Sequence, residues 1–148
     1  MAGFTMVEIV TVIVVTTVLA AVAAPRFMGR SGFDSRGFSD PAQGTVRYAQ
    51  KVAVGKRRNV FVDITAGSVS ACYDAACTTP VVDPVSAAPL VVTPPAGSGV
   101  TLAPVTSFSF NGLGQPSLVA NLTVTVSVAG EADRTFTIQR ETGYVAAP

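Results

Sequence analysis

The feature that most constrains this fold is an apolar run at the start of the sequence. From Phe4 to Ala24 the chain reads FTMVEIVTVIVVTTVLAAVAA, with a single charged side chain, Glu8. As an α-helix rising about 1.5 Å per residue, this run is about 31 Å long and matches the hydrocarbon core of a bilayer. We therefore expect a hydrophobic transmembrane helix over residues 4–25. Residues 26–148 are numerous enough to bury a core of their own.

A cleaved secretory signal is the alternative interpretation of the same run. Its small residues Ala21, Val22 and Ala23 have the spacing of a signal-peptidase site. A signal peptide also needs a basic start and a shorter apolar stretch, whereas residues 1–3 carry no basic side chain. These features favour a helix that is retained in the mature protein.

Glu8 is the residue of this run that requires a chemical explanation. A carboxylate within a membrane helix costs about 2.5–3.5 kcal/mol on insertion scales, so it is expected to have a partner. No lysine or arginine lies within two helical turns of Glu8 on either side. An α-amino group near Phe4, from this chain or a neighbouring one, is the natural cation.

The segment Gly3–Glu8 (GFTMVE), followed by about sixteen apolar residues and Pro25, resembles the N-terminus of type IV prepilins and type II secretion pseudopilins. The resemblance implies that a prepilin peptidase cleaves after Gly3 and methylates the new N-terminal Phe4. It also implies that Glu8 pairs with the Phe4 amine of a neighbouring subunit during filament assembly, and that Pro25 kinks the helix. Residues 1–3 would be a leader peptide, complete or truncated.

The pattern after the apolar run predicts a second helix followed by strands. Asp40 is a suitable N-cap with Pro41 at the first helical position, and the glycine-rich residues 28–37 before them predict a break. The apolar face of this helix would be Val46, Ala49, Val52 and Ala53, and its end would fall at residues 55–59.

After residue 59 the apolar spacing changes to two, which is typical of strands. We expect strands at residues 60–64, 68–73, 107–110, 121–128 and 134–139, with turns at 66–67 and 129–133 and a proline-rich loop at 78–99. The order of elements predicts an α+β fold with an antiparallel sheet packed on the second helix.

This plan is similar to the pilin arrangement, in which a long N-terminal hydrophobic helix carries a short helix and an antiparallel β-sheet head. Within that family, Phe38 and residues 47–49, 55–58, 108–116 and 142–145 resemble the GspH/FimT group. Residues 33–38 and 47–51 look most like the C-type minor pilin of the mannose-sensitive haemagglutinin pilus. The resemblance implies a minor pilin or pseudopilin in the bacterial inner membrane, with its head in the periplasm. Its partners would be prepilin peptidase and other subunits of the filament.

Catalysis and metal binding have little support in the sequence. The absence of histidine excludes a serine–histidine–aspartate triad and a histidine zinc site. The only two cysteines, Cys72 and Cys77, are too few for a closed zinc site, and a disulfide is the natural assignment outside the cytoplasm. Glu131 and Asp133 could in principle approach calcium, but acidic turns are commonly only solvated. We expect no enzyme activity, no cofactor and no metal.

The net charge of +1 conceals an uneven distribution. Residues 26–58 carry eight Lys or Arg against two Asp, and residues 59–148 carry two against six acidic residues. We expect a basic collar beside the apolar helix and an acidic head, suited to packing between subunits and to anionic lipid. The alternative function is a DNA- or surface-binding minor pilin, whose candidate contacts are Lys51, Lys56, Arg57 and Arg58. No aromatic residue is interleaved among these four for base stacking.

Overall fold

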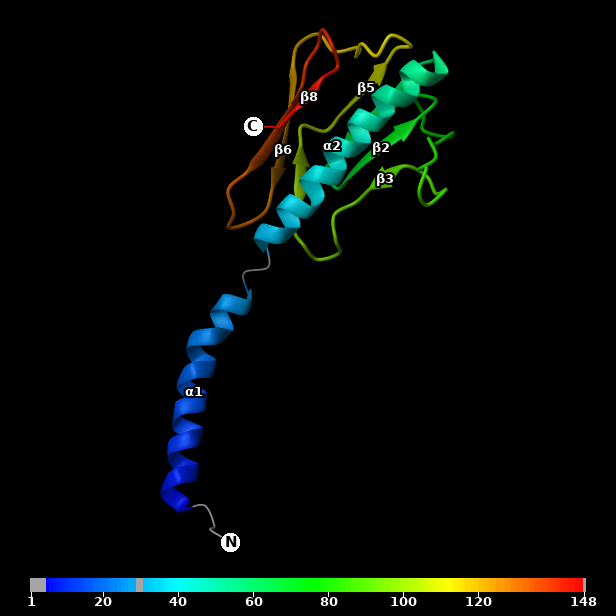
Figure 1. The fold of residues 1–148 in the computed structure, drawn as a ribbon. Helices are drawn as coiled ribbons and strands as arrows, with labels where there is room; N and C mark the ends of the chain where they lie inside the picture. The colour runs from blue at the N-terminus through cyan, green and yellow to red at the C-terminus, as the bar shows by residue number, and fades with distance from the viewer. Residues whose placement is uncertain (1–4, 29–30, 148) are drawn as a thin grey trace. The chain divides into compact units, whose positions relative to one another are not determined.

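The computed structural model describes residues 5–28 and 31–147 and contains two compact units, divided between residues 30 and 31 (Figure 1). The first unit is the helix α1 (Met6–Met28), which continues three residues past Pro25. The second unit holds α2 (Ser31–Lys56) and eight short strands. Each unit is described by itself below.

In α1, all side chains from Thr5 to Val22 are exposed within this chain. The hydroxyls of Thr11, Thr16 and Thr17 donate to backbone carbonyls three and four residues earlier, at 2.7–3.0 Å. These bonds satisfy the hydroxyl protons without any outside partner, so the threonines add little polarity to the helix surface.

No helix in the described ranges is both long enough and apolar enough to count as a membrane span.

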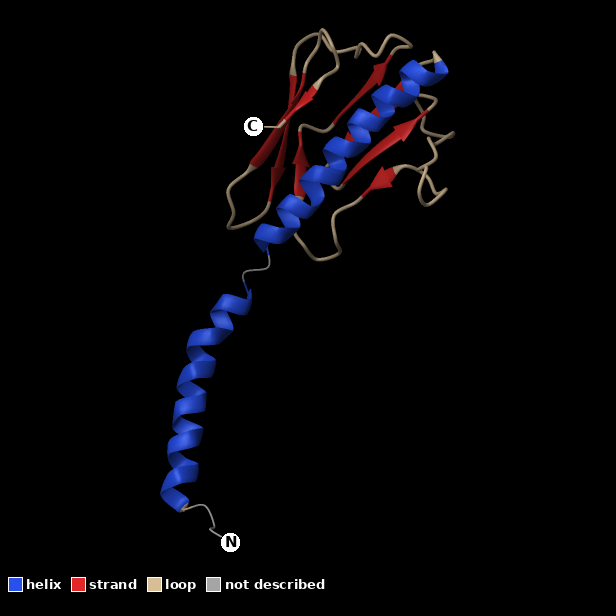
Figure 2. Ribbon diagram, viewed as in Figure 1, coloured by secondary structure: helices blue, strands red, loops and turns tan. Residues whose placement is uncertain are grey.

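The second unit is an α+β domain with two antiparallel sheets. The first sheet has the order β3 (Val91–Val92), β2 (Ser68–Cys72), β1 (Val60–Thr65), β5 (Thr106–Phe110). The second has the order β4 (Thr101–Ala103), β6 (Leu122–Ser127), β7 (Arg134–Ile138), β8 (Val145–Ala146). Figure 2 shows α2 lying along the first sheet, with the second sheet beside it. The expected α+β class and both hairpins are confirmed, whereas the expected single sheet is in fact two.

The core forms where the apolar face of α2 meets the inward side chains of the strands. Val46, Ala49 and Ala53 are fully buried as expected, and Val52 is half-buried. They face alternate residues of the strands, such as Val62 of β1, with further contributions from the second sheet. Each fully buried valine or larger apolar side chain contributes about 1.5–3 kcal/mol.

The predicted start of the second helix at Asp40 is wrong, because α2 begins at Ser31 and contains Pro41 in its interior. An interior proline removes a backbone hydrogen bond and costs about 3 kcal/mol. The turns before Pro41 offset this cost by burying Phe38, which is 2 % exposed, and Ser35 against the sheets. Tertiary packing therefore overrides the local break that the glycines and the proline predict.

Candidate assembly and binding surfaces

Glu8 lies in the first turns of α1 with an exposed side chain. Its backbone N–H donates to the carbonyl and the hydroxyl of Thr5, at 3.1 and 3.3 Å, which closes the helix start. Within the described ranges, the one ion pair joins Arg140 and Glu141, so no described cation neutralises the Glu8 carboxylate. Gly3 and Phe4, the expected cleavage and methylation sites, lie outside the described residues.

The large side chains of α1 between Met6 and Val22 form an apolar surface on all sides of the helix. Their exposed fractions run from 51 % to 85 %. Contiguous exposed apolar surface of this extent marks contact with a membrane or with protein partners.

A polar stripe on α2 holds the helix against the second sheet. Ser35, Ser39 and Gln43 are buried, and they recur every four residues along one side of the helix. Ser35 donates to the carboxylate of Glu131 at 2.8 Å, while Gln43 accepts from Arg47, which also donates to the Val145 carbonyl at 3.0 Å. Sequence reasoning missed this stripe, although the four-residue spacing of its members was visible.

Gln50 continues the stripe and fastens two loops to α2. Its Nε2 donates to the carbonyls of Gly114 and Thr142, both at 2.8 Å. Gly143 has a φ of +69°, and a Cβ atom there would stand 2.5 Å from both Gln50 Nε2 and the Gly114 oxygen. Only glycine therefore permits this close approach of helix and loops.

The four cations proposed for DNA or lipid contact are exposed and lie at the C-terminal end of α2. Arg36, near the start of α2, precedes Lys56 by about 30 Å of helix. The expected basic collar is therefore not one cluster, because its described cations in the second unit are spread from Arg36 to Arg58.

Tyr73 brings an aromatic ring to this cationic end, although no aromatic residue is interleaved among the four cations in the sequence. The guanidinium carbon of Arg58 lies 4.4 Å from the centroid of the Tyr73 ring, and Lys56 Nζ lies 5.5 Å from it. Both distances are within the range of cation–π attraction. Tyr73 follows β2 and is remote in sequence from Lys56 and Arg58. Its ring contacts these two cations only because the β1–β2 hairpin returns the chain to the end of α2.

The expected disulfide between Cys72 and Cys77 is present, with a Cα–Cα distance of 5.0 Å. Beside it, the Asp74 carboxylate accepts hydrogen bonds from the Thr78 hydroxyl, the Thr79 N–H and the Thr78 N–H, at 2.5–2.9 Å. These donors, the Thr78 hydroxyl first, lower the pKa of Asp74 below its ordinary value. The disulfide and the ionised Asp74 together fix the turn that carries Tyr73.

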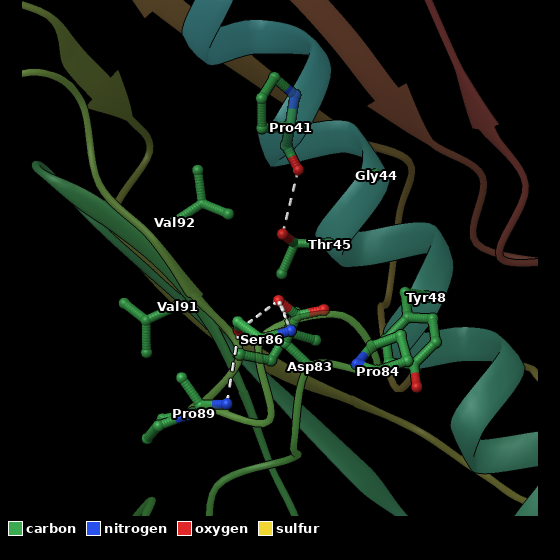
Figure 3. A pocket seen from close by; sticks show the side chains of 12 residues that line it. Pro41, Gly44, Thr45, Tyr48, Asp83, Pro84, Ser86, Pro89, Val91 and Val92 are labelled. Carbon is green, nitrogen blue, oxygen red and sulfur yellow. Dashed lines mark hydrogen bonds between the residues drawn. The ribbon is translucent and has the colours of Figure 1, made fainter.

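A groove of about 420 Å³ separates α2 from the proline-rich segment 83–92 (Figure 3). Thr45 and Tyr48 border it on the helix side, and Asp83 and Ser86 border it on the loop side. The Ser86 hydroxyl donates to Asp83 at 2.6 Å and is the main cause of the lowered pKa of that carboxyl. The Thr45 hydroxyl donates to the Pro41 carbonyl, so the side chains of Thr45, Asp83 and Ser86 are engaged within the chain.

In the part of the chain that the structure describes, no cluster of three or more acidic or cysteine side chains could hold a metal ion. Glu131, considered above for calcium, instead accepts the hydrogen bond of Ser35.

Comparison with known proteins shows the fold. No protein-family model and no curated protein matches the sequence. Two crystal structures of the type IV minor pilin FimU of Pseudomonas aeruginosa match at TM-scores of 0.58 and 0.59 and 17% identity, covering 76% of this chain and 89% and 91% of theirs. The minor pseudopilin EpsH from the type 2 secretion system of Vibrio cholerae matches at 0.55 and 13% identity, covering 80% and 95%. The chain thus has the fold of these minor pilins and pseudopilins.

Proposed function

We propose that this chain is a minor pilin or pseudopilin, a structural subunit of a type IV pilus or a type II secretion pseudopilus and not an enzyme. The observation that carries the proposal is a head with the fold of FimU and EpsH, joined to an N-terminal helix that exposes apolar side chains on all sides. In this proposal, a prepilin peptidase cleaves after Gly3 and methylates Phe4. The apolar segment 4–25 holds the subunit in the bacterial inner membrane until it enters the filament.

Glu8 gives the assembly its register. Apolar helix surfaces slide along one another at little cost, because dispersion contacts are similar at every position. A carboxylate paired with a neighbour's Phe4 amine at about 4 Å gains about 4 kcal/mol at an effective dielectric constant of 20. One axial position of a subunit relative to its neighbour then has a much lower free energy than the others.

Substitution of Glu8 tests this mechanism. We expect Glu8→Ala to remain in the membrane fraction but to be lost from sheared filaments, because insertion depends on apolarity and incorporation on the charge pair. Thr11→Ala is the matched control, since the Thr11 hydroxyl bonds only its own helix. Normal incorporation of Glu8→Ala contradicts the mechanism.

Mass spectrometry of the mature N-terminus tests processing. We expect an N-methylated Phe4 as the first residue of the filament subunit. A mature chain starting at Ala24 or Pro25 instead identifies a cleaved secretory signal and excludes the proposal.

DNA binding by the head is the second candidate function, favoured by one observation. Tyr73 lies beside Lys56 and Arg58, so an aromatic ring accompanies the cations as in single-strand binding proteins. The full chain in detergent should then bind oligonucleotides more weakly as salt rises, and Arg58→Ala should weaken binding. Absence of binding at low salt rejects this candidate. The assignment to the GspH/FimT group, and to the mannose-sensitive haemagglutinin system within it, rests on the sequence resemblance and stays a prediction.

A further inference from the structure

The C-terminal end of α2 carries an exposed surface in which apolar side chains lie beside one cation. It consists of Val54, Arg57 and Leu113, and we call it the α2-end surface. Val54 is 46 % and Leu113 81 % exposed. An open cavity of about 600 Å³ is lined by Val54, Arg57, Gly112 and Leu113. From this geometry we infer that the α2-end surface docks a partner protein that presents a carboxylate beside apolar side chains.

Arg57 stands where a helix normally ends in glycine. Its φ is +48°, its N–H donates to the Val54 carbonyl, and the N–H of Arg58 donates to the Ala53 carbonyl. This is the helix-ending pattern in which the left-handed residue is usually glycine, because any other L-residue is strained there. Backbone strain of this kind gathers at functional sites, where the side chain is needed.

The surrounding backbone holds Arg57 in this conformation. Gly112 packs against it so closely that a Cβ atom at Gly112 would stand 3.0 Å from the Arg57 carbonyl carbon. In the same loop, the Asn111 side chain accepts from the N–H groups of Leu113 and Gln115, both at 2.9 Å. An exposed leucine on a loop fixed in this way is preorganised for contact, so binding need not order it.

The three consecutive cations at the end of α2 have different surroundings. Lys56 and Arg58 contact the Tyr73 ring, whereas the guanidinium of Arg57 has no hydrogen bond or ion pair with any described residue. An arginine beside exposed aliphatic side chains is typical of the anchor residues in protein interfaces. Phosphate tracks instead rely on several cations together. The composition of the α2-end surface therefore favours a protein over a nucleic acid.

Charge complementarity defines the partner's chemistry. A guanidinium pairs most strongly with a carboxylate, through two parallel hydrogen bonds, and the pairing strengthens when apolar contacts exclude water from it. Val54 and Leu113 would provide that exclusion beside Arg57. If the proposed function holds, on which this step rests, the partner is another subunit of the same filament.

The test is photo-cross-linking of the full chain in cells that express it, through Leu113→p-benzoylphenylalanine. We expect a product joined at a protein segment that contains Asp or Glu beside apolar residues. Arg57→Glu should lower its yield by about tenfold, and replacing the partner's carboxylate with arginine should restore it. Val54→Ala should lower the yield too. Val85→Ala, at a side chain 92 % exposed and outside the α2-end surface, is the matched control and should not change it.

Arg57→Gly separates docking from folding, because glycine relieves the left-handed backbone while removing the guanidinium. We expect a lower cross-link yield from a fold that is at least as stable. Yields unchanged by Arg57→Glu and Arg57→Gly overturn the inference, as does cross-linking to nucleic acid alone, to a segment without carboxylates, or to nothing.

Incorporation into sheared filaments, measured in the same cells, distinguishes this inference from the proposed function. A chain that enters filaments without the Leu113 cross-link overturns the docking surface alone. A charge-reversible cross-link on a chain that never enters filaments supports the docking surface and overturns the proposed function.

Discussion

Gly143→Ala is the substitution whose cost the structure defines most sharply. Gly143 has a φ of +69°, and a Cβ atom there meets Gln50 Nε2 and the Gly114 oxygen at 2.5 Å. The left-handed backbone alone costs an alanine about 1–2 kcal/mol. The new methyl group also displaces the Gln50 amide from its two carbonyl acceptors, and each lost hydrogen bond costs about 1 kcal/mol. We therefore expect a loss of about 3–4 kcal/mol in the free energy of unfolding.

Gly130→Ala separates these two contributions. Gly130 has a φ of +86° but has no atom within 4 Å of its Cβ position, so only the backbone term applies. For a head of this size, about 1 kcal/mol lowers Tm by about 4 °C. We expect a fall of about 4–8 °C for Gly130→Ala and about 12–16 °C for Gly143→Ala.

Thermal unfolding of the full chain in detergent micelles measures this difference. The near-UV signal of the three tyrosines is the suitable probe, because the chain has no tryptophan and the 23 residues of α1 would add to the far-UV helicity of the 26 residues of α2. In a Gln50→Ala background, Gly143→Ala should cost less, since the amide that it displaces is already absent. Equal losses for Gly143→Ala and Gly130→Ala refute the reasoning, because the close contact would then contribute nothing.

Three further predictions concern the end of α2 and the disulfide turn. Arg57→Gly should raise the free energy of unfolding by about 0.5–1 kcal/mol by relieving the left-handed backbone, measurable as a higher Tm. Hydrogen bonding to the ionised form lowers the pKa of folded Asp74, so its stabilisation is present above the unfolded pKa of about 3.9 and is lost as pH falls through the folded value. Asp74→Asn should therefore be less stable than the unaltered chain at pH 6, and the difference between them, compared by urea midpoints, should shrink as the pH falls below about 3.9. The Cys72–Cys77 disulfide closes only a short loop. Its reduction should therefore lower the free energy of unfolding by about 2 kcal/mol, the low end of the usual range, as measured by Tm with and without reductant.

The sequence predicted the strands wherever alternation ran for five residues or more. β1, β2, β6 and β7 fall within about two residues of the expected ranges, and their hairpins pair as expected. β4 and β8 have three and two residues, too few for a period to emerge, and they complete the second sheet. Their absence from the prediction explains why one sheet was expected where there are two.

The candidate site was predictable where its chemistry is local in sequence. Cys72 and Cys77 form the expected disulfide because only five positions separate them. The contact of Tyr73 with Arg58 and the two hydrogen bonds of Gln50 depend on segments 15 to 92 residues apart. Such contacts follow from the register of the sheets and the length of α2, which local patterns do not contain.

The packing of the head tolerates many residue sets, whereas the proposed charge pair of Glu8 does not. This difference explains why the fold is shared at 13–17% identity. The core requires only apolar residues of suitable size at the helical and strand spacings, and many residue sets meet that requirement. The polar stripe of α2 is equally tolerant, because several of its bonds, such as that from Arg47 to Val145, end on backbone carbonyls that any residue supplies. A pairing such as that proposed between Glu8 and the Phe4 amine allows no such substitution, because only a carboxylate can neutralise an amine inside an apolar filament. Relatives of this chain should therefore keep Gly3, Phe4 and Glu8 while their heads diverge.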